Sequence, residues 1–225
     1  MPIHLRVDLP DRPGSLAQLT RGFAAAGADV LSVQVSDRAG GRVVDDFLLA
    51  WPQSRPDEPL IRAVDGVVGG RILGIRRVAT VPEENATLDL VTHVLWQPHR
   101  AVETLVDLLP AVADADWSAA LLRGTTGQLL HSSATAPLPL PSLPADLPRA
   151  VAFTHAAGEL VSIPVPGADV TILLARSYGP PFLRREVDEV ARVVELVAAL
   201  LRALGSPNLT ATAPTRRLLP VAAAR

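Results

Sequence analysis

Two residue types are missing from this chain of 225 residues: lysine and cysteine. Without cysteine the chain can form no disulfide, offers no thiol nucleophile and cannot build a cysteine-rich zinc site. Without lysine it has no Schiff-base residue, no phosphate-loop lysine and no lysine general base. Aromatic residues are scarce at 4%, but hydrophobic residues make up 48% of the chain and charged residues only 20%. The chain can therefore bury a core, while several classes of enzyme are excluded.

Charge and hydropathy exclude two further kinds of partner. The net charge is −2 and no basic stripe is present, so nonspecific binding to nucleic acid is not expected. The most apolar helical stretch, residues 187–204, is interrupted by charged side chains and does not suit a membrane span. Asp8 and Asp11 near the start do not suit a signal peptide. We expect a cytoplasmic protein without a membrane or nucleic-acid partner.

Motifs that would mark catalysis are also missing. The five histidines do not have the spacing of a metal site; they are His4, His93, His99, His131 and His155. There is no G-x-S-x-G elbow and no glycine-rich dinucleotide fingerprint. Asp45 and Asp46 are adjacent in a predicted strand, so they point to opposite faces and cannot act as a carboxylate pair. We therefore expect no metal, no cofactor and no enzymatic activity.

The hydrophobic pattern of the first 80 residues predicts four strands and two helices. Apolar residues alternate over residues 3–9, and a helical pattern over residues 15–26 ends at Gly27. Further strands are predicted at residues 30–36, 42–51 and 71–78, with a short helix before the last. The order strand, helix, strand, strand, helix, strand is that of a ferredoxin-like fold.

The alternation also predicts which side chains face the core of this domain. In the second strand the inward residues are expected to be Leu31, Val33 and Val35. The outward positions of the first two strands should leave an open sheet face that packs against a partner subunit; they are His4, Arg6, Ser32 and Gln34.

The most informative stretch is the turn between the first strand and the first helix. It reads Asp11, Arg12, Pro13, Gly14, Ser15 and Leu16. Because Gly14 has no Cβ, a carboxylate can approach the amides that follow it, where the helix dipole favours an anion. Pro13 fixes the turn. The turn is therefore predicted to bind a small anion such as a carboxylate.

Residues 3 to about 79 resemble an ACT domain, a small regulatory module that binds amino acids. Besides the turn, the resemblance rests on residues 27–30, Gly-Ala-Asp-Val, and on residues 43–47, Val-Val-Asp-Asp-Phe. It implies that two domains pair and hold an amino acid at their interface, with backbone contacts from residues 11–16. It also implies that Asp29 and Val30 lie next to that turn, where the Asp29 carboxylate would receive the ligand ammonium group.

The second half resembles a GAF-like sensory domain, with a leading helix, a central antiparallel sheet, a variable pocket loop and a long closing helix. The resemblance is carried by residues 172–176, Ile-Leu-Leu-Ala-Arg, by residues 180–182, Pro-Pro-Phe, and by a helix with Glu186, Val190 and Leu201. Several side chains could line a pocket, but each is more typical of a core or strand-end position, and none is assigned a ligand: Trp117, Arg123, Phe153, His155, Arg176 and Tyr178.

We thus predict an α+β protein with an ACT domain at residues 1–80, a linker at 81–87, a GAF-like domain at 88–205 and a disordered tail at 206–225. The expected function is that of a non-catalytic regulatory protein. It would form a homodimer through the ACT domain, bind an amino acid there and signal through the GAF-like domain to a partner enzyme or signalling protein. The alternative is an adaptor or regulatory subunit of a metabolic enzyme that binds no metabolite itself.

Overall fold

A computed structural model describes residues 2–78, 85–123, 128–141 and 147–205. The chain divides into two compact units. The first consists of Met1–Val81 together with Tyr178–Arg185, and the second of Pro82–Ser177 together with Glu186–Arg225. The predicted linker overlaps residues 81–84, which lie outside the described residues, and the helix after it begins at Ala86. The predicted tail also lies outside them.

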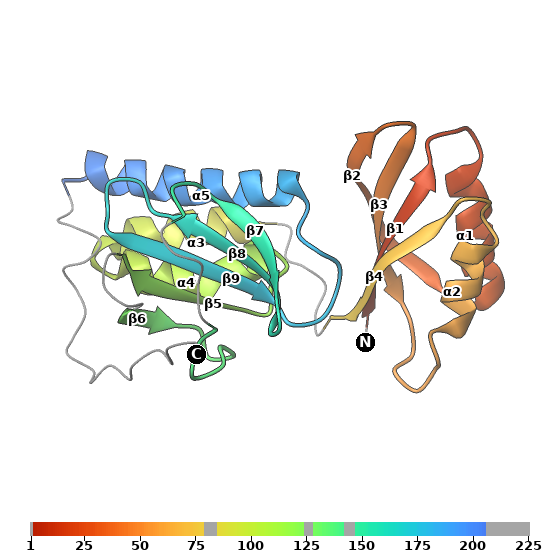
Figure 1. The fold of residues 1–225 in the computed structure, drawn as a ribbon, viewed down its shortest axis with the longest axis horizontal. Coiled ribbons are helices and arrows are strands. Elements are labelled where there is room, and N and C mark those ends of the chain that lie inside the picture. Colours follow the sequence, from red (N-terminus) through yellow and green to blue (C-terminus); the bar gives the residue numbers. More distant parts are fainter. Residues whose placement is uncertain (1, 79–84, 124–127, 142–146, 206–225) are drawn as a thin grey trace. The chain divides into compact units, whose positions relative to one another are not determined.

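The first unit has the predicted βαββαβ order. Its elements are β1 (Pro2–Pro10), α1 (Ser15–Ala26), β2 (Asp29–Ala39), β3 (Arg42–Ala50), α2 (Glu58–Asp65) and β4 (Arg71–Arg77). The strands form one antiparallel sheet in the order β2-β3-β1-β4. Helices α1 and α2 pack side by side on one face of it (Figure 1). This order confirms the ferredoxin-like fold predicted for the first half.

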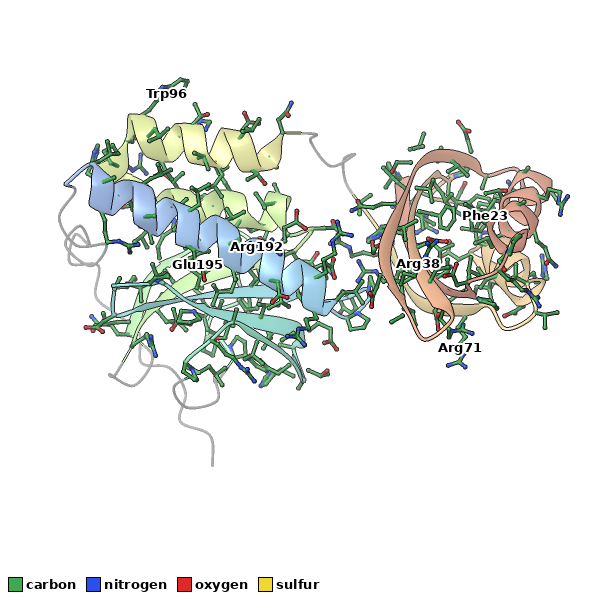
Figure 2. The ribbon with its side chains drawn as sticks, turned by 90° about the horizontal axis from the view of Figure 1, so that it is seen from above. Phe23, Arg38, Arg71, Trp96, Arg192 and Glu195 are labelled. Atoms are coloured by element: carbon green, nitrogen blue, oxygen red, sulfur yellow. The ribbon has the colours of Figure 1, made fainter. Side chains whose placement is uncertain are left out.

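The core of this unit lies between the helices and the central strands. The alternating residues of β1 are fully buried, namely Ile3, Leu5, Val7 and Leu9. Phe23 of α1, labelled in Figure 2, lies between the helices and the sheet. It packs edge to face against Phe47 of β3, with ring centroids 5.2 Å apart. Helix α1 is capped by a glycine at each end: Gly14 at its N-terminus and Gly27 at its C-terminus have positive φ angles of 94° and 76°. These positions explain why the sequence predicted the limits of α1 correctly.

The predicted burial of the second strand is wrong, although its register sets Val33 opposite Phe47 and Val35 opposite Asp45, on the face that the helices cover. Leu31, Val33 and Val35 are 45%, 47% and 47% exposed instead of buried, whereas Ser36 is buried. Strand β2 lies at the sheet edge, and its register with β3 shifts twice, between Val30 and Ser32 and between Val35 and Asp37. Each shift inserts a residue and disturbs the alternation.

The sheet face away from the helices is not left open as predicted, because residues Tyr178–Arg185 of the same unit contact it. Arg6 is 2% exposed, and its Nη1 donates a hydrogen bond of 2.9 Å to the Pro181 carbonyl. Gly74, paired with Arg6 in the sheet, leaves room for this segment: a Cβ there would lie 2.6 Å from the Cα of Pro180. Part of this face is thus covered by the chain itself.

The second unit begins with α3 (Ala86–Trp96), a short 3-10 turn (Pro98–Arg100) and α4 (Ala101–Val112). A five-stranded antiparallel sheet follows, made of β5 (Trp117–Leu122), β6 (Gln128–Ser132), β7 (Val151–His155), β8 (Gly158–Pro164) and β9 (Val170–Arg176). Its order is β6-β5-β9-β8-β7. The closing helix is α5 (Arg184–Ala203), and the three helices lie on one side of the sheet (Figure 1). The predicted α+β, GAF-like layout is confirmed.

The other face of this second sheet holds an apolar cluster. Ser118 donates a hydrogen bond to the Val106 carbonyl of α4, so its neighbour Trp117 faces away from the helices. There Trp117 packs with Leu140 from the proline-rich segment, and Phe153 packs against the same cluster. Trp117 is therefore a core residue, as its residue type predicts, and Phe153 is partly buried against the same core. In the described parts of the chain, no helix is long and apolar enough to cross a membrane.

Candidate functional site

The turn that follows β1 is closed by its own backbone. The Asp11 N–H donates to the Gly41 carbonyl at 2.8 Å, the Arg12 N–H to the Pro10 carbonyl at 2.9 Å, and the Ser15 N–H to the Arg12 carbonyl at 3.3 Å. Gly14 is the N-cap of α1 in a left-handed conformation with φ of 94°, and nothing lies within 4 Å of the position its Cβ would take. Glycine is therefore required by the backbone angle, and the space beside it is open.

Two N–H groups at the start of α1 remain available. The Gln18 N–H donates to the Gly14 carbonyl at 2.8 Å, which begins the helical bonding. Glycine has no side chain that could cap the preceding amides, and the first turn carries no acidic residue. Within the described residues, the N–H groups of Leu16 and Ala17 have no acceptor. Such amides, together with the positive end of the helix dipole, favour an anion.

Charged side chains surround this turn. Asp11 and Arg38 form an ion pair of 3.2 Å, in which the Arg38 side chain is 65% exposed. Asp45 of β3 is buried, and its Oδ1 has no hydrogen-bond partner in the described part of the chain. Burial raises the pKa of Asp45, the charge of Asp46 raises it further, and the charge of Arg38 opposes both. Asp45 is not among the site residues predicted from the sequence, although its position between the inward residues Val43 and Phe47 already predicts a buried carboxylate.

On the opposite face of the sheet, Asp46 is the centre of a hydrogen-bonded network. It accepts bonds from His4 Nε2 at 2.7 Å, from Arg6 Nε at 2.7 Å and Nη2 at 2.9 Å, and from the Ser36 hydroxyl. Burial alone would raise the pKa of Asp46, but the hydrogen bonds from His4, Arg6 and Ser36 and the charge of Arg6 outweigh it and hold its pKa well below the ordinary value. As predicted, Asp45 and Asp46 have different surroundings on the two faces.

The strand order and the glycine-bearing turn lie in a segment that matches a known family. Residues 3–50 match the ACT domain family. The match runs from β1 through the turn and α1 to the end of β3, so the first unit contains the ACT domain that the sequence resembles. A comparison with curated protein sequences gave no match.

Solved structures resemble the chain at low sequence identity. The GAF domain from Acinetobacter phosphoenolpyruvate-protein phosphotransferase is 11% identical over 55% of this chain and 96% of its own, with a TM-score of 0.40. The ligand-free regulatory subunit of aspartate kinase from Thermus thermophilus is 14% identical over 88% of this chain and 97% of its own, with a TM-score of 0.30. A formyltetrahydrofolate deformylase from Pseudomonas putida is 15% identical over 43% of this chain but only 38% of its own, also with a TM-score of 0.30.

The ACT domain does not bring all predicted site residues together. Residues 11–16 lie at the end of β1, as expected, but Asp29 and Val30 do not lie next to them in one copy of the chain. Asp29 pairs with Ala50, and Ala50 pairs with Pro2 at the beginning of β1. Because α1 carries the chain back along the sheet before β2 begins, Asp29 lies about 25 Å from the turn, the length of β1. The predicted adjacency is therefore wrong within one protomer.

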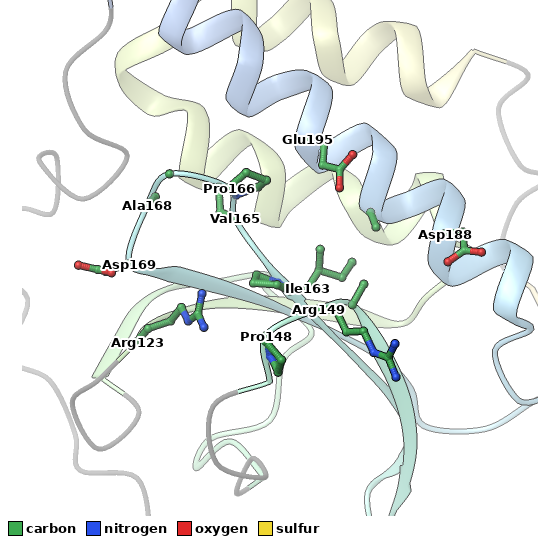
Figure 3. A pocket seen from close by; sticks show the side chains of 14 residues that line it. Arg123, Pro148, Arg149, Ile163, Val165, Pro166, Ala168, Asp169, Asp188 and Glu195 are labelled. Carbon is green, nitrogen blue, oxygen red and sulfur yellow. The ribbon is translucent and has the colours of Figure 1, made fainter.

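The second unit contains a separate cavity of about 710 Å³ (Figure 3). One wall is α5, with Asp188 and Glu195, and the rest is formed largely by the loop joining β8 to β9 together with Arg123 and Arg149. The volume suits a small molecule, and charges of both signs line it. Of the residues considered from sequence, Arg123 lines this cavity, whereas Arg176 is buried, donating to the Ala113 and Asp114 carbonyls and to Glu186.

Proposed function

We propose that this chain is a non-catalytic regulatory protein whose ACT domain binds a free amino acid at the turn formed by residues 11–16. The observation that carries the proposal is the pair of unbonded amides, Leu16 and Ala17, behind a glycine N-cap with open space beside it. These donors suit the carboxylate that every amino acid carries. Arg12 and the Asp11–Arg38 ion pair border the same turn and add polar contacts.

A second copy of the chain would complete the site. Strand β2 is an edge strand of 11 residues, and edges of this kind pair readily with another strand. Its exposed apolar residues would be buried by antiparallel pairing with β2 of the second copy. Such pairing is two-fold symmetric and would set Asp29 of one copy beside Ala39 of the other, at the end of the sheet where the turn lies. Asp29 and Val30 would then join the site across the interface, and the Asp29 carboxylate would receive the ammonium group.

The output would pass along the chain to the second unit. Residues 178–185 belong to the first unit and continue directly into α5. Binding that alters the pairing at β2 would act on Ser36, which bonds Asp46, and through Arg6 on the Pro181 carbonyl. A ligand can bias such an element only through different affinities for its two arrangements, usually by a few kcal/mol at most.

Calorimetry and thermal-shift measurements against the twenty amino acids test this function. A binding signal for at least one of them supports the sensor. The alternative, an adaptor or regulatory subunit of a metabolic enzyme that binds no metabolite, predicts no heat and no thermal shift for any of them, and that outcome would replace the proposal.

The dimer edge gives a separate prediction. In the proposed pairing residue 33 of each copy lies opposite Val35 of the other, so Val33→Arg brings two arginines close together on either side of the two-fold axis. We therefore expect the dimer to dissociate about 100-fold more readily, roughly 2.7 kcal/mol. Analytical ultracentrifugation measures the change. The matched control is Val68→Arg, since Val68 is 73% exposed in the same unit but outside β2. Equal association of both variants would exclude β2 as the interface.

A further inference from the structure

Two buried polar atoms at the turn end of the ACT domain have no partner among the described residues: Ser15 Oγ and Asp45 Oδ1. Ser15 is 5% exposed and Asp45 is 2% exposed. A buried acceptor without a donor is costly, and native proteins rarely keep one without a reason. Two of them beside unbonded helix amides point to a missing group.

The packing of α1 on β3 places both atoms at the same end of the core. The two elements run in the same direction, and Phe23 contacts Phe47. Going back along the chain, Ser15 lies about 12 Å before Phe23 along the helix, and Asp45 lies about 7 Å before Phe47 along the strand. Asp45 is therefore beneath the first two turns of α1, on the side where Ser15 also faces the sheet.

The charges nearby leave this carboxylate uncompensated. Asp45 is influenced by the charges of Asp11 and Arg38, which border the turn. Arg38 is engaged by Asp11 at 3.2 Å, and no cation in the described residues comes within ion-pair distance of Asp45. Asp11 and Arg38 neutralise each other, and Arg12 of the same turn is exposed and forms no ion pair with Asp45, so the buried carboxylate has no cationic partner among the described residues. A group of positive charge is what this environment favours.

The two strands beside Asp45 differ in exposure. Asp45 lies between two neighbours in the sheet. Val7 of β1 pairs with it on one side and is fully buried, whereas Val35 of β2 pairs with it on the other side and is 47% exposed. A side chain that enters from the turn would therefore pass over Val35 to reach the carboxylate. The same strand is the edge at which we place the second copy.

We propose that the amino acid bound at the ACT turn has a basic side chain, and that Asp45, assisted by the Ser15 hydroxyl, is the acceptor that selects it. The inference rests on the proposed function and adds the class of ligand. The turn amides hold the carboxylate that all amino acids share. A lysine-type ammonium or an arginine-type guanidinium supplies the donors that Ser15 and Asp45 lack. An aliphatic side chain leaves both acceptors unpaired, and an acidic one is repelled by Asp45.

Calorimetry with L-lysine, L-arginine, L-norleucine and L-glutamate tests the inference on the full chain. Norleucine has the aliphatic chain of lysine without the ammonium group. We expect the protein to bind lysine or arginine at least tenfold more tightly than norleucine and to show no measurable affinity for glutamate. In Asp45→Asn we expect this preference to fall to less than threefold while norleucine binding is retained. Asp65→Asn, which removes an exposed carboxylate of the same unit, should keep the full preference.

The outcomes separate the inference from the function on which it rests. Equal binding of lysine and norleucine by the unaltered chain, or an unchanged preference in Asp45→Asn, overturns the basic-ligand assignment and leaves an amino-acid sensor. Absence of binding to all amino acids overturns both. Folding is checked by the melting temperature, which should not fall in Asp45→Asn, because a neutral amide is easier to bury than a charged carboxylate.

Discussion

Gly14→Val is expected to abolish amino-acid binding at the turn and to leave α1 and the sheet folded. Nothing lies within 4 Å of the new Cβ, so the substitution causes no clash; its effect comes from the φ angle of 94°. A β-branched residue avoids this region, at a cost of roughly 1–3 kcal/mol. The backbone relieves that strain by rotating residue 14, and the rotation turns the Leu16 and Ala17 amides away from the ligand. Calorimetry measures the lost affinity, and far-ultraviolet circular dichroism measures the retained helix.

A matched variant separates the turn from general strain. Gly205 also has a positive φ, 63°, and open space around its Cβ position, but it follows α5 in the second unit. Gly205→Val should cost a similar amount of stability and keep the affinity. If Gly14→Val binds amino acids as the unaltered chain does, the turn is not the site.

Local sequence signals predicted much of the ACT domain. Glycines on both sides of a three-to-four apolar spacing predicted α1 to the residue, and strict alternation predicted the buried face of β1. The same alternation failed for β2, because periodicity shows that two faces differ but not that a helix covers one of them. The helices lie over the central strands, and two register shifts disturb the edge strand.

The candidate site was predicted only in part, because some of its contacts join residues that lie far apart in the sequence. The turn is local, so residues 11–16 could be recognised from their order. The place of Asp29 depends on how α1 returns the chain across the sheet, and the contact of Arg6 with Pro181 joins residues far apart in sequence. Neither leaves a local pattern. The burial of Asp45 could have been predicted, since it shares a strand face with Phe47.

Arg6→Met is expected to destabilise the ACT domain by about 3–5 kcal/mol, the range for removing one member of a buried ion pair. Methionine keeps much of the packing volume, but Asp46 loses the two hydrogen bonds from the Arg6 guanidinium, and the Pro181 carbonyl loses the hydrogen bond that Arg6 donates. Hydrogen exchange of the β1 and β3 amides in urea would measure the loss in this unit separately from the second one. The double variant Arg6→Met with Asp46→Leu should recover part of it, because no uncompensated carboxylate remains.

The loss of unfolding free energy in Arg6→Met should also depend on pH in a defined direction. The pKa of Asp46 is lowered in the folded state, so its contribution is complete above the unfolded value, near pH 4, and is lost as pH falls through the folded pKa. Removal of Arg6 moves this pKa back toward the ordinary value and reduces the part of the stability that acid can remove. The difference between the two proteins should therefore be largest near pH 7 and shrink toward pH 2. A difference that stays constant over this range would mean that Arg6 stabilises the domain by packing rather than by its charge on Asp46.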